Sequence, residues 1–250
     1  MSSSRRPRLY VIPGSHPCRA AMLMLEHKGL GCRTVEFPGG LQTFLMRPLG
    51  FPGRTVPALK LGGVRVQTNR RIARFLDELV PDPPLLPRDR REEIEAAERL
   101  ADEVLQPLAR RLVLAAGCRD LSSLDGGGET ERMGPLLAHT TRRRARIFRV
   151  ARRFFGISDE TEALDRAALP CVLDEVDAWM AIGVLNGPEL NAADFQIAPS
   201  LGLLASRLDL REEVEFRPSW QLAERLVPAR TQAGQGRPQA GYIRRVGSSE

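Results

Sequence analysis

The sequence predicts an α/β domain followed by an all-helical domain, and two observations lead to this fold class. The first 80 residues show the order strand, helix, strand, connection, strand, strand, helix. A proline-rich stretch then interrupts the chain, and beyond it the apolar residues recur at helical spacing without a convincing strand. We therefore expect two domains of different class, and we find no internal repeat.

The elements of the first domain follow from short apolar runs and from the residues that end them. Residues 9–12 form a β-branched and aromatic run that stops at Pro13-Gly14, which predicts a buried strand. The pattern further predicts a helix over 17–28, a strand over 33–37, a poorly specified helical connection over 41–49, an antiparallel hairpin of 58–61 and 64–66, and a helix over 70–79. A βαβ unit with a right-handed crossover, extended by a hairpin, is the thioredoxin-like layout.

The second half of the chain predicts helices only. Residues 80–89 contain four prolines, which forbid a continuing helix and predict a stiff linker. Helices are expected over 90–116, 129–155, 159–182, 192–208 and 218–226, with a glycine-rich loop over 117–128. The predicted organisation is a flexible start over 1–8, a thioredoxin-like domain over 9–79, the linker, a helical domain over 90–227 and a disordered tail over 228–250.

Composition excludes several classes of function. No apolar run reaches the roughly 18–20 residues of a membrane span, and no signal peptide precedes the first strand, so we expect a cytoplasmic protein without a membrane partner. Four scattered cysteines and three scattered histidines predict neither a disulfide framework nor a metal site. The net charge of +6 comes from a chain with only two lysines among its 37 basic residues. That bias indicates a GC-rich genome, and no nucleic-acid partner is predicted.

The segment with the most chemical information is Leu9 to Arg19, where a strand turns through Pro13-Gly14 and delivers Ser15 to the start of a helix. Unpaired backbone N–H groups and the helix dipole stabilise an anion at such a place. A hydroxyl there can donate a charge-assisted hydrogen bond to a thiolate. The alternative is that Ser15 only caps the helix, since serine is a favoured N-cap residue.

Three further segments carry a resemblance to a known family. They are Thr-Val-Pro-Ala-Leu at 55–59, Gln-Thr-Asn at 67–69 and Asn-Gly-Pro-Glu-Leu-Asn-Ala-Ala-Asp-Phe at 186–195. Together with Pro-Gly-Ser-His-Pro-Cys-Arg at 13–19, in this order and spacing, they resemble the cytosolic glutathione S-transferases, most closely the serine-type (delta/theta-like) members. The resemblance covers roughly residues 9–79 and 183–204, and it implies the glutathione transferase architecture.

The resemblance implies a role for each matching position of the thiol site. Ser15 takes the place of the serine that hydrogen-bonds the glutathione sulfur and lowers its pKa. Pro57 takes the place of the cis-proline that exposes the backbone of Val56 to the cysteinyl part of the ligand. Gln67 and Thr68 stand where the family holds the γ-glutamyl group, the alternative for both being helix capping.

The remaining implied roles are less uniform. Residues 51–54 depart from the family pattern, so Arg54 is either a contact to the glycyl carboxylate or a solvated arginine. Asn191 and Asp194 match the family's structural N-capping motif. Cys18 lies in the register of the second cysteine of a glutaredoxin motif. It is either a redox residue or, as we expect, a small apolar residue in the core.

The predicted function is a glutathione S-transferase-like enzyme that activates glutathione, or a related thiol, as co-substrate for attack on an electrophilic, apolar substrate. Such an enzyme serves detoxification, needs no metal, and is consistent with a homodimer. The alternatives are a non-catalytic thiol-binding or interaction protein of the same fold, and a thiol-dependent reductase or peroxidase. Because residues 51–54 depart from the family, we expect glutathione itself to bind weakly, with a free energy of about −4 to −6 kcal/mol.

One basic segment stands outside this function. Residues 141–155 carry seven arginines, with apolar residues on one helical side. The segment is either a core-facing helix with a solvated arginine face, which we favour, or a surface for an anionic partner or a membrane.

Overall fold

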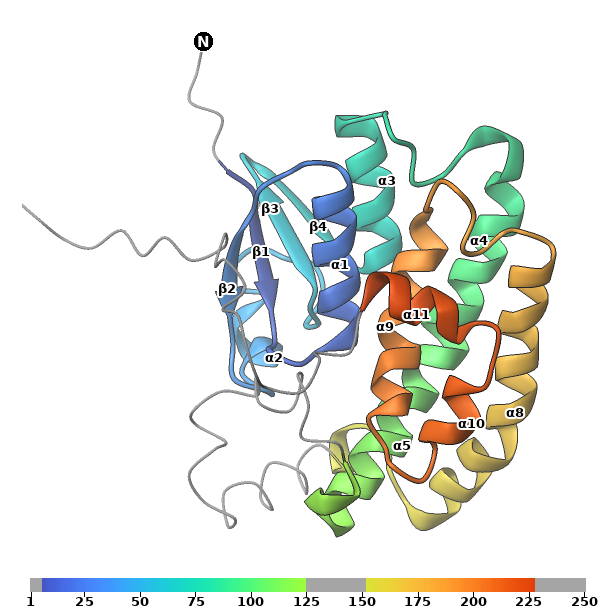
Figure 1. Cartoon of the computed structure of the whole chain (residues 1–250). Coiled ribbons are helices and arrows are strands. Elements are labelled where there is room, and N and C mark those ends of the chain that lie inside the picture. Colours follow the sequence, from blue (N-terminus) through green and yellow to red (C-terminus); the bar gives the residue numbers. More distant parts are fainter. Residues whose placement is uncertain (1–5, 125–151, 228–250) are drawn as a thin grey trace, which may run out of the picture.

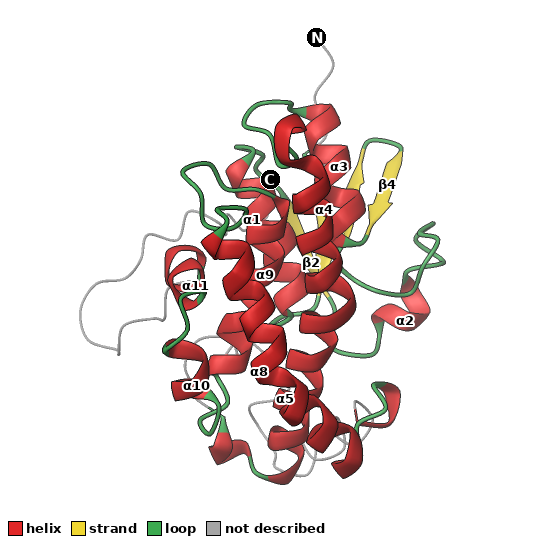
Figure 2. Cartoon of the chain, turned by 90° about the vertical axis from the view of Figure 1, so that its right-hand side faces the viewer, coloured by secondary structure: helices red, strands yellow, loops and turns green. Residues whose placement is uncertain are grey.

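The structure is a computed structural model of the 250-residue chain, and it describes residues 6–124 and 152–227. A small sheet with two helices on one face lies beside a bundle of helices (Figure 1). These two helices stand between the sheet and the bundle, so the domains meet helix against helix. Figure 2 shows the bundle from its outer side, with the sheet behind it.

The first domain has the predicted thioredoxin-like topology. Its four strands are β1 (Arg8–Val11), β2 (Arg33–Glu36), β3 (Ala58–Leu61) and β4 (Val64–Gln67), in the order β2-β1-β3-β4. β1 is parallel to β2 and antiparallel to β3, and β3 and β4 form the antiparallel hairpin. The helices are α1 (His16–His27), the short α2 (Gln42–Leu45) and α3 (Asn69–Leu79). β1 begins at Arg8, one residue before the predicted strand, and the Arg33 amide donates to the carbonyl of the preceding Pro7.

The alternation of side chains along β1 separates two cores. Leu9 and Val11 are buried against α1 and α3, whereas Tyr10 points to the other face, where α2 lies. On that face Tyr10 packs against the rings of Phe37 and Phe51 at centroid distances of 5.9 and 5.4 Å. The face toward the helical domain is the larger core, and the α2 face is a small aromatic cluster.

The regular elements in the described residues of the second domain are helices, apart from one isolated β-bridge. It contains η1 (Arg88–Arg90), α4 (Arg91–Leu100), η2 (Ala101–Leu105), α5 (Gln106–Arg119), η3 (Leu121–Ser123), α8 (Asp159–Ala181), α9 (Ala192–Ala205), α10 (Arg211–Glu215) and α11 (Trp220–Leu226). The predicted helix over 90–116 is therefore interrupted by the π-helical turn η2, and it continues to Arg119 into the predicted loop. The pattern also missed α10, because five residues are too few to show a helical period.

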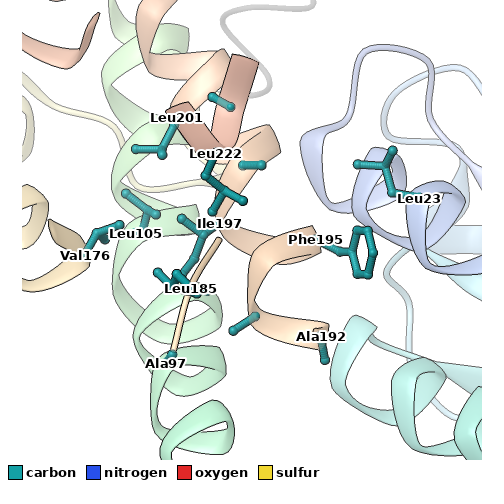
Figure 3. Packing of buried hydrophobic residues seen from close by; sticks show 14 of the residues in the cluster. Leu23, Ala97, Leu105, Val176, Leu185, Ala192, Phe195, Ile197, Leu201 and Leu222 are labelled. Carbon is teal, nitrogen blue, oxygen red and sulfur yellow. The ribbon is translucent and has the colours of Figure 1, made fainter. Parts of the chain in front are cut away.

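The two domains share one hydrophobic core, and α9 is its centre. Nearly every residue of α9 is buried, which explains why its sequence has no polar face. Figure 3 shows Phe195 leaving α9 toward α1, where Leu23 lies, while Ile197 and Leu201 point back into the bundle. Phe195 is 2% exposed, and its ring centroid lies 5.0 Å from that of His27 on α1. Separation of the domains would expose this ring, so its burial stabilises their contact.

A buried polar group crosses the same interface. Glu98 on α4 is fully buried and accepts hydrogen bonds from Arg74 on α3 at 2.6 Å and from the Gln196 amide on α9 at 2.5 Å. Burial raises the pKa of this carboxyl, although Arg74 and Gln196 act in the opposite direction. An ion pair and a hydrogen bond at Glu98 therefore link the two domains, in addition to the apolar packing around Phe195.

Some predicted segments lie outside the described residues. These are the first five residues, most of the arginine-rich segment 141–155 with the rest of the predicted helix over 129–155, and the tail 228–250. Their predictions stand untested. Among the residues that are described, no helix is long and apolar enough to cross a membrane.

Candidate functional site

The register of the sheet brings the predicted thiol-site residues to one end of the first domain. Tyr10 on β1 pairs with Ala58 at the start of β3, and Ala58 pairs with Gln67 at the end of β4. Consequently three of these residues lie at the same end of the sheet, where Ser15 follows β1, Pro57 precedes β3 and Thr68 follows β4. Segments more than 40 residues apart in the sequence become neighbours there.

Ser15 occupies the N-cap position of α1, but its side chain does not cap the helix. Its backbone is extended (φ −83°, ψ 113°), and the hydroxyl accepts no hydrogen bond from the first turn. The Ser15 amide bonds the Ile12 carbonyl at 3.2 Å, and the Ser15 carbonyl accepts the Arg19 amide at 2.9 Å. The backbone thus holds the residue at the positive end of α1, and the predicted contact of its hydroxyl with a thiol stays a prediction.

Thr68 repeats this arrangement at the start of α3. It is the N-cap residue, it is exposed, and its hydroxyl makes no cap hydrogen bond. Its φ of +76° is unusual for a β-branched residue and costs of the order of 1–3 kcal/mol, as at many ligand sites. The Thr68 amide donates to the Pro57 carbonyl at 3.3 Å, which ties the start of α3 to the loop before β3. The peptide bond between Val56 and Pro57 is cis, the conformation that the resemblance implies.

Gln67 lies at this site, but its side chain forms hydrogen bonds with other residues of the protein. Its side chain is 4% exposed, its Oε1 accepts the Gly53 amide at 2.7 Å, and its Nε2 donates to the Thr55 carbonyl. Both functional atoms therefore hold the loop that carries Arg54. Arg54 itself is exposed. The predicted ligand contacts of Gln67 and Arg54 stay predictions, and the structure adds a positioning role for Gln67.

The helical domain contributes a cation that the sequence did not point to. Arg110 on α5 lies near His16 and Cys18 at the start of α1, and its guanidinium stacks 4.9 Å from the centre of the Phe155 ring. Burial lowers the pKa of Arg110, as does neighbouring Arg111, while Asp102 and Cys18 raise it. An arginine keeps its charge under these conditions. Its positive potential therefore adds to that of the α1 N-terminus.

His16 follows Ser15 and is 6% exposed. Burial, and secondly the charge of Arg110, lower the pKa of His16 to about 3, so the ring is neutral at physiological pH. A base this weak cannot take the proton of a thiol that titrates near pH 8.5. We therefore exclude His16 as the general base of this site.

A second contribution of the helical domain faces the start of α3. Asp102 and Glu103 lie in η2, and the Glu103 carboxylate is 3.7 Å from the Arg70 guanidinium, two residues after Thr68. Burial raises the pKa of Asp102, against the opposing effect of Arg70. No local sequence signal marks Asp102 or Arg110, because only the packing of the domains brings them to this end of the sheet.

Cys18 packs in the larger core and is 1% exposed. Its burial is the environment of a structural cysteine rather than of an exposed redox thiol. Nor do the described residues contain a cluster of His, Cys, Asp and Glu that could hold a metal ion.

Asn191 and Asp194 form the predicted capping box at the start of α9. The Asn191 side chain accepts the Ala193 amide at 2.9 Å, and the Asp194 carboxylate accepts the amides of Asn191 and Asn186 at 2.8 and 2.7 Å. Both residues are buried in the helical domain. Their role is to hold α9 and the preceding loop.

Comparison with known proteins agrees with this architecture. Residues 9–84 match the family model of the glutathione S-transferase N-terminal domain. None of the curated proteins compared matches the chain. The fold is that of the glutathione transferases, a thioredoxin-like domain with a four-stranded mixed sheet followed by a helical domain.

Solved structures show the same fold at low sequence identity. A glutathione S-transferase of Ceriporiopsis subvermispora in complex with glutathione is 16% identical, with a TM-score of 0.65 over 89% of this chain and 95% of that one. A glutathione transferase of Phanerochaete chrysosporium is 20% identical, with a TM-score of 0.64 over 90% and 98%. One from Methylobacterium radiotolerans in complex with glutathione sulfonate is 22% identical, with a TM-score of 0.54 over 94% and 100%.

Proposed function

We propose that the protein binds glutathione or a closely related thiol and stabilises its thiolate at Ser15 for attack on an electrophilic, apolar substrate. The observation that carries the proposal is the Ser15 hydroxyl, which lies at the N-terminus of α1 without capping that helix. The glutathione-bound structures of the same fold support the choice of ligand.

The chemistry follows from the charges at this edge. A free thiol has a pKa of about 8.5 and is only a few per cent ionised at neutral pH. A hydrogen bond from Ser15, the dipole of α1 and the charge of Arg110 all favour the thiolate, and a pKa lowered by two units corresponds to about 2.7 kcal/mol. The thiol proton leaves to solvent, because His16 is too weak a base. The sulfur then forms its bond to the electrophile, with displacement of a leaving group or addition to a double bond.

The rest of the ligand would extend from Ser15 across the loop before β3 to α3. The backbone of Val56 would pair with the cysteinyl part as an added strand does. The exposed Thr68 hydroxyl and the N-terminus of α3 suit the γ-glutamyl carboxylate. Since Gln67 is bonded to the loop, the γ-glutamyl end has fewer partners than the resemblance implies, which agrees with weak binding of glutathione.

The test is the ionisation of the bound thiol. Isothermal titration calorimetry of the full chain with glutathione gives the affinity, and the ultraviolet absorbance of the thiolate as a function of pH gives the pKa in the complex. We expect a bound pKa at least one unit below that of free glutathione, and a return toward the free value in Ser15→Ala. Binding with an unshifted pKa would favour the non-catalytic alternative, and the absence of any binding would reject the thiol site.

A further inference from the structure

A row of four cations crosses the sheet on the face of α2. Arg33 on β2 is the register partner of Arg8 on β1, Arg8 is the partner of Lys60 on β3, and Lys60 is the partner of Arg65 on β4. Residues directly opposite in a sheet point to the same face. That face is the one of Tyr10, which follows Arg8 by two residues on β1. We call Arg33, Arg8, Lys60 and Arg65 the cation row.

The cation row places like charges next to one another across the sheet. Like charges directly opposite one another in a sheet are destabilising. Among residues 6–124 and 152–227, no carboxylate forms an ion pair with any member of the row. Arg65 donates only to the backbone carbonyls of Leu49 and Gly63. Four neighbouring cations that no carboxylate of the described residues neutralises indicate a site for an external anion.

An apolar hollow lies directly beside two members of the row. It has a volume of about 400 Å³, within the range of small-molecule sites, and Arg8 and Arg33 form one of its sides. The rest of its lining is the tyrosine and five apolar residues Tyr10, Val35, Phe37, Leu45, Pro48 and Leu49. The hollow lies on the same face of the sheet as the four-residue α2, which lies toward the far end of β1 (Figure 1). None of the predicted thiol-site residues lines it.

We propose that this hollow binds a small organic anion with an apolar ring or chain, and that the anionic group lies on Arg8 and Arg33. Both arginines are exposed, and two planar guanidinium groups suit the oxygens of a carboxylate, sulfate or phosphate. Lys60 and Arg65 extend the positive potential along the row. The apolar wall takes the body of the ligand, a ring or a chain. A nucleic acid fits less well, because Tyr10 is 5% exposed and offers no free ring face for a base.

The test compares two probes that share one ring system. Naphthalene-2-sulfonate carries the anion and 2-naphthol does not, and each is titrated into the full chain by calorimetry at neutral pH. We expect the sulfonate to bind at least tenfold more tightly than the naphthol, with an affinity that falls as salt is added. Arg8→Gln combined with Arg33→Gln should weaken sulfonate binding at least tenfold. The matched control is Arg88→Gln, an exposed arginine outside the row, which should bind like the wild type.

Each alternative outcome would overturn the proposal. If the double variant binds the sulfonate as tightly as the wild type does, the two arginines do not form the site. If the naphthol binds as tightly as the sulfonate, the site does not recognise an anionic group. Inorganic sulfate that binds as tightly as the aromatic sulfonate would show an anion site without an apolar part. Displacement of the probe by S-hexylglutathione would place it in the thiol site instead. Thermal unfolding measures the stability of the double variant, which should be no lower than that of the wild type because the substitutions relieve repulsion between like charges. If the double variant does not fold, Arg33→Gln alone is used in the same titration.

Discussion

The Nζ atom of buried Lys28 lies 2.6 Å from Oδ1 of partly buried Asp77, and this pair joins the end of α1 to α3. Lys28 also donates to the carbonyls of Val80 and Pro83, while the Asp77 carboxylate accepts the amides of Leu85 and Leu86. The two side chains thus hold residues 80–86 of the proline-rich linker. A lysine suits this place because three donors on one compact ammonium reach three separate oxygens.

Replacement of this lysine should destabilise the protein strongly. Lys28→Met leaves the Asp77 charge partly buried without its partner, and we expect a loss of about 3–5 kcal/mol in the free energy of unfolding. Urea denaturation measures it. The matched control is Lys60→Met, at the only other lysine, which should change stability by less than about 1 kcal/mol or raise it. Equal effects of the two changes would show that the Lys28 pair is not what holds the linker.

Removal of the Ser15 hydroxyl should slow the reaction without unfolding the protein. We expect Ser15→Ala to lower kcat with a generic electrophile by one or more orders of magnitude, because a hydrogen bond to the thiolate is lost. Since the hydroxyl caps nothing, the melting temperature should change little. Cys18→Ser is the companion variant. Loss of activity there, with Ser15→Ala unaffected, would instead point to redox chemistry.

Gly53 is predicted to be required for the loop beside the thiol site. A Cβ atom at Gly53 would lie 2.7 Å from Oε1 of Gln67, closer than packing allows. Gly53→Ala should therefore displace the loop and weaken thiol affinity several-fold, measured by calorimetry. Gly63→Ala is the control, since an added Cβ there meets nothing within 4 Å. An unchanged affinity in Gly53→Ala would separate this loop from the binding site.

The cap of α9 should contribute to stability and not to binding. Asn191→Ala removes the acceptor of the Ala193 amide and the donor to the Val184 carbonyl, and should cost about 0.5–2 kcal/mol. Ser158→Ala removes the corresponding cap of α8 and should have a similar cost. Thiol affinity should stay unchanged in both variants. Loss of thiol binding in folded Asn191→Ala would identify Asn191 as a ligand residue.

The pH dependence of stability should report the burial of Asp194. Desolvation raises the pKa of this carboxyl to about 6, against hydrogen bonds from Asn186 and Asn191. In the unfolded chain it titrates near 3.8, so between these values the folded state holds more protons. The contribution of Asp194 to stability should therefore decline as pH rises from about 4 to about 6, by about 1–3 kcal/mol.

The comparison with Asp194→Asn isolates this effect, because other groups titrate alike in both proteins. Urea denaturation at several pH values gives the difference in unfolding free energy between wild type and variant. This difference should fall across the interval and level off above it. A difference that rises with pH would mean that the two amides dominate over desolvation.

Local sequence was sufficient for most elements. The strand that ends at Pro13-Gly14, the hairpin around Gly62-Gly63 and the helix capped at Asn191 were predicted within a residue or two at these ends, because turns and caps depend on neighbouring residues. Family-like motifs also placed Ser15, Pro57 and Thr68 at one site. The π turn η2 and the five-residue α10 were missed, since neither leaves a periodic signal.

The sequence by itself determined the fold class and the order of most elements, and it predicted which positions form a thiol site. Only the tertiary structure decided which distant groups meet, as with Arg110 beside His16, Lys28 on Asp77, and the alignment of Arg33, Arg8, Lys60 and Arg65. The physical reason is that capping, turns and periodicity act over a few residues. Strand register and domain packing, in contrast, set the distances between charges that the chain separates by tens of residues.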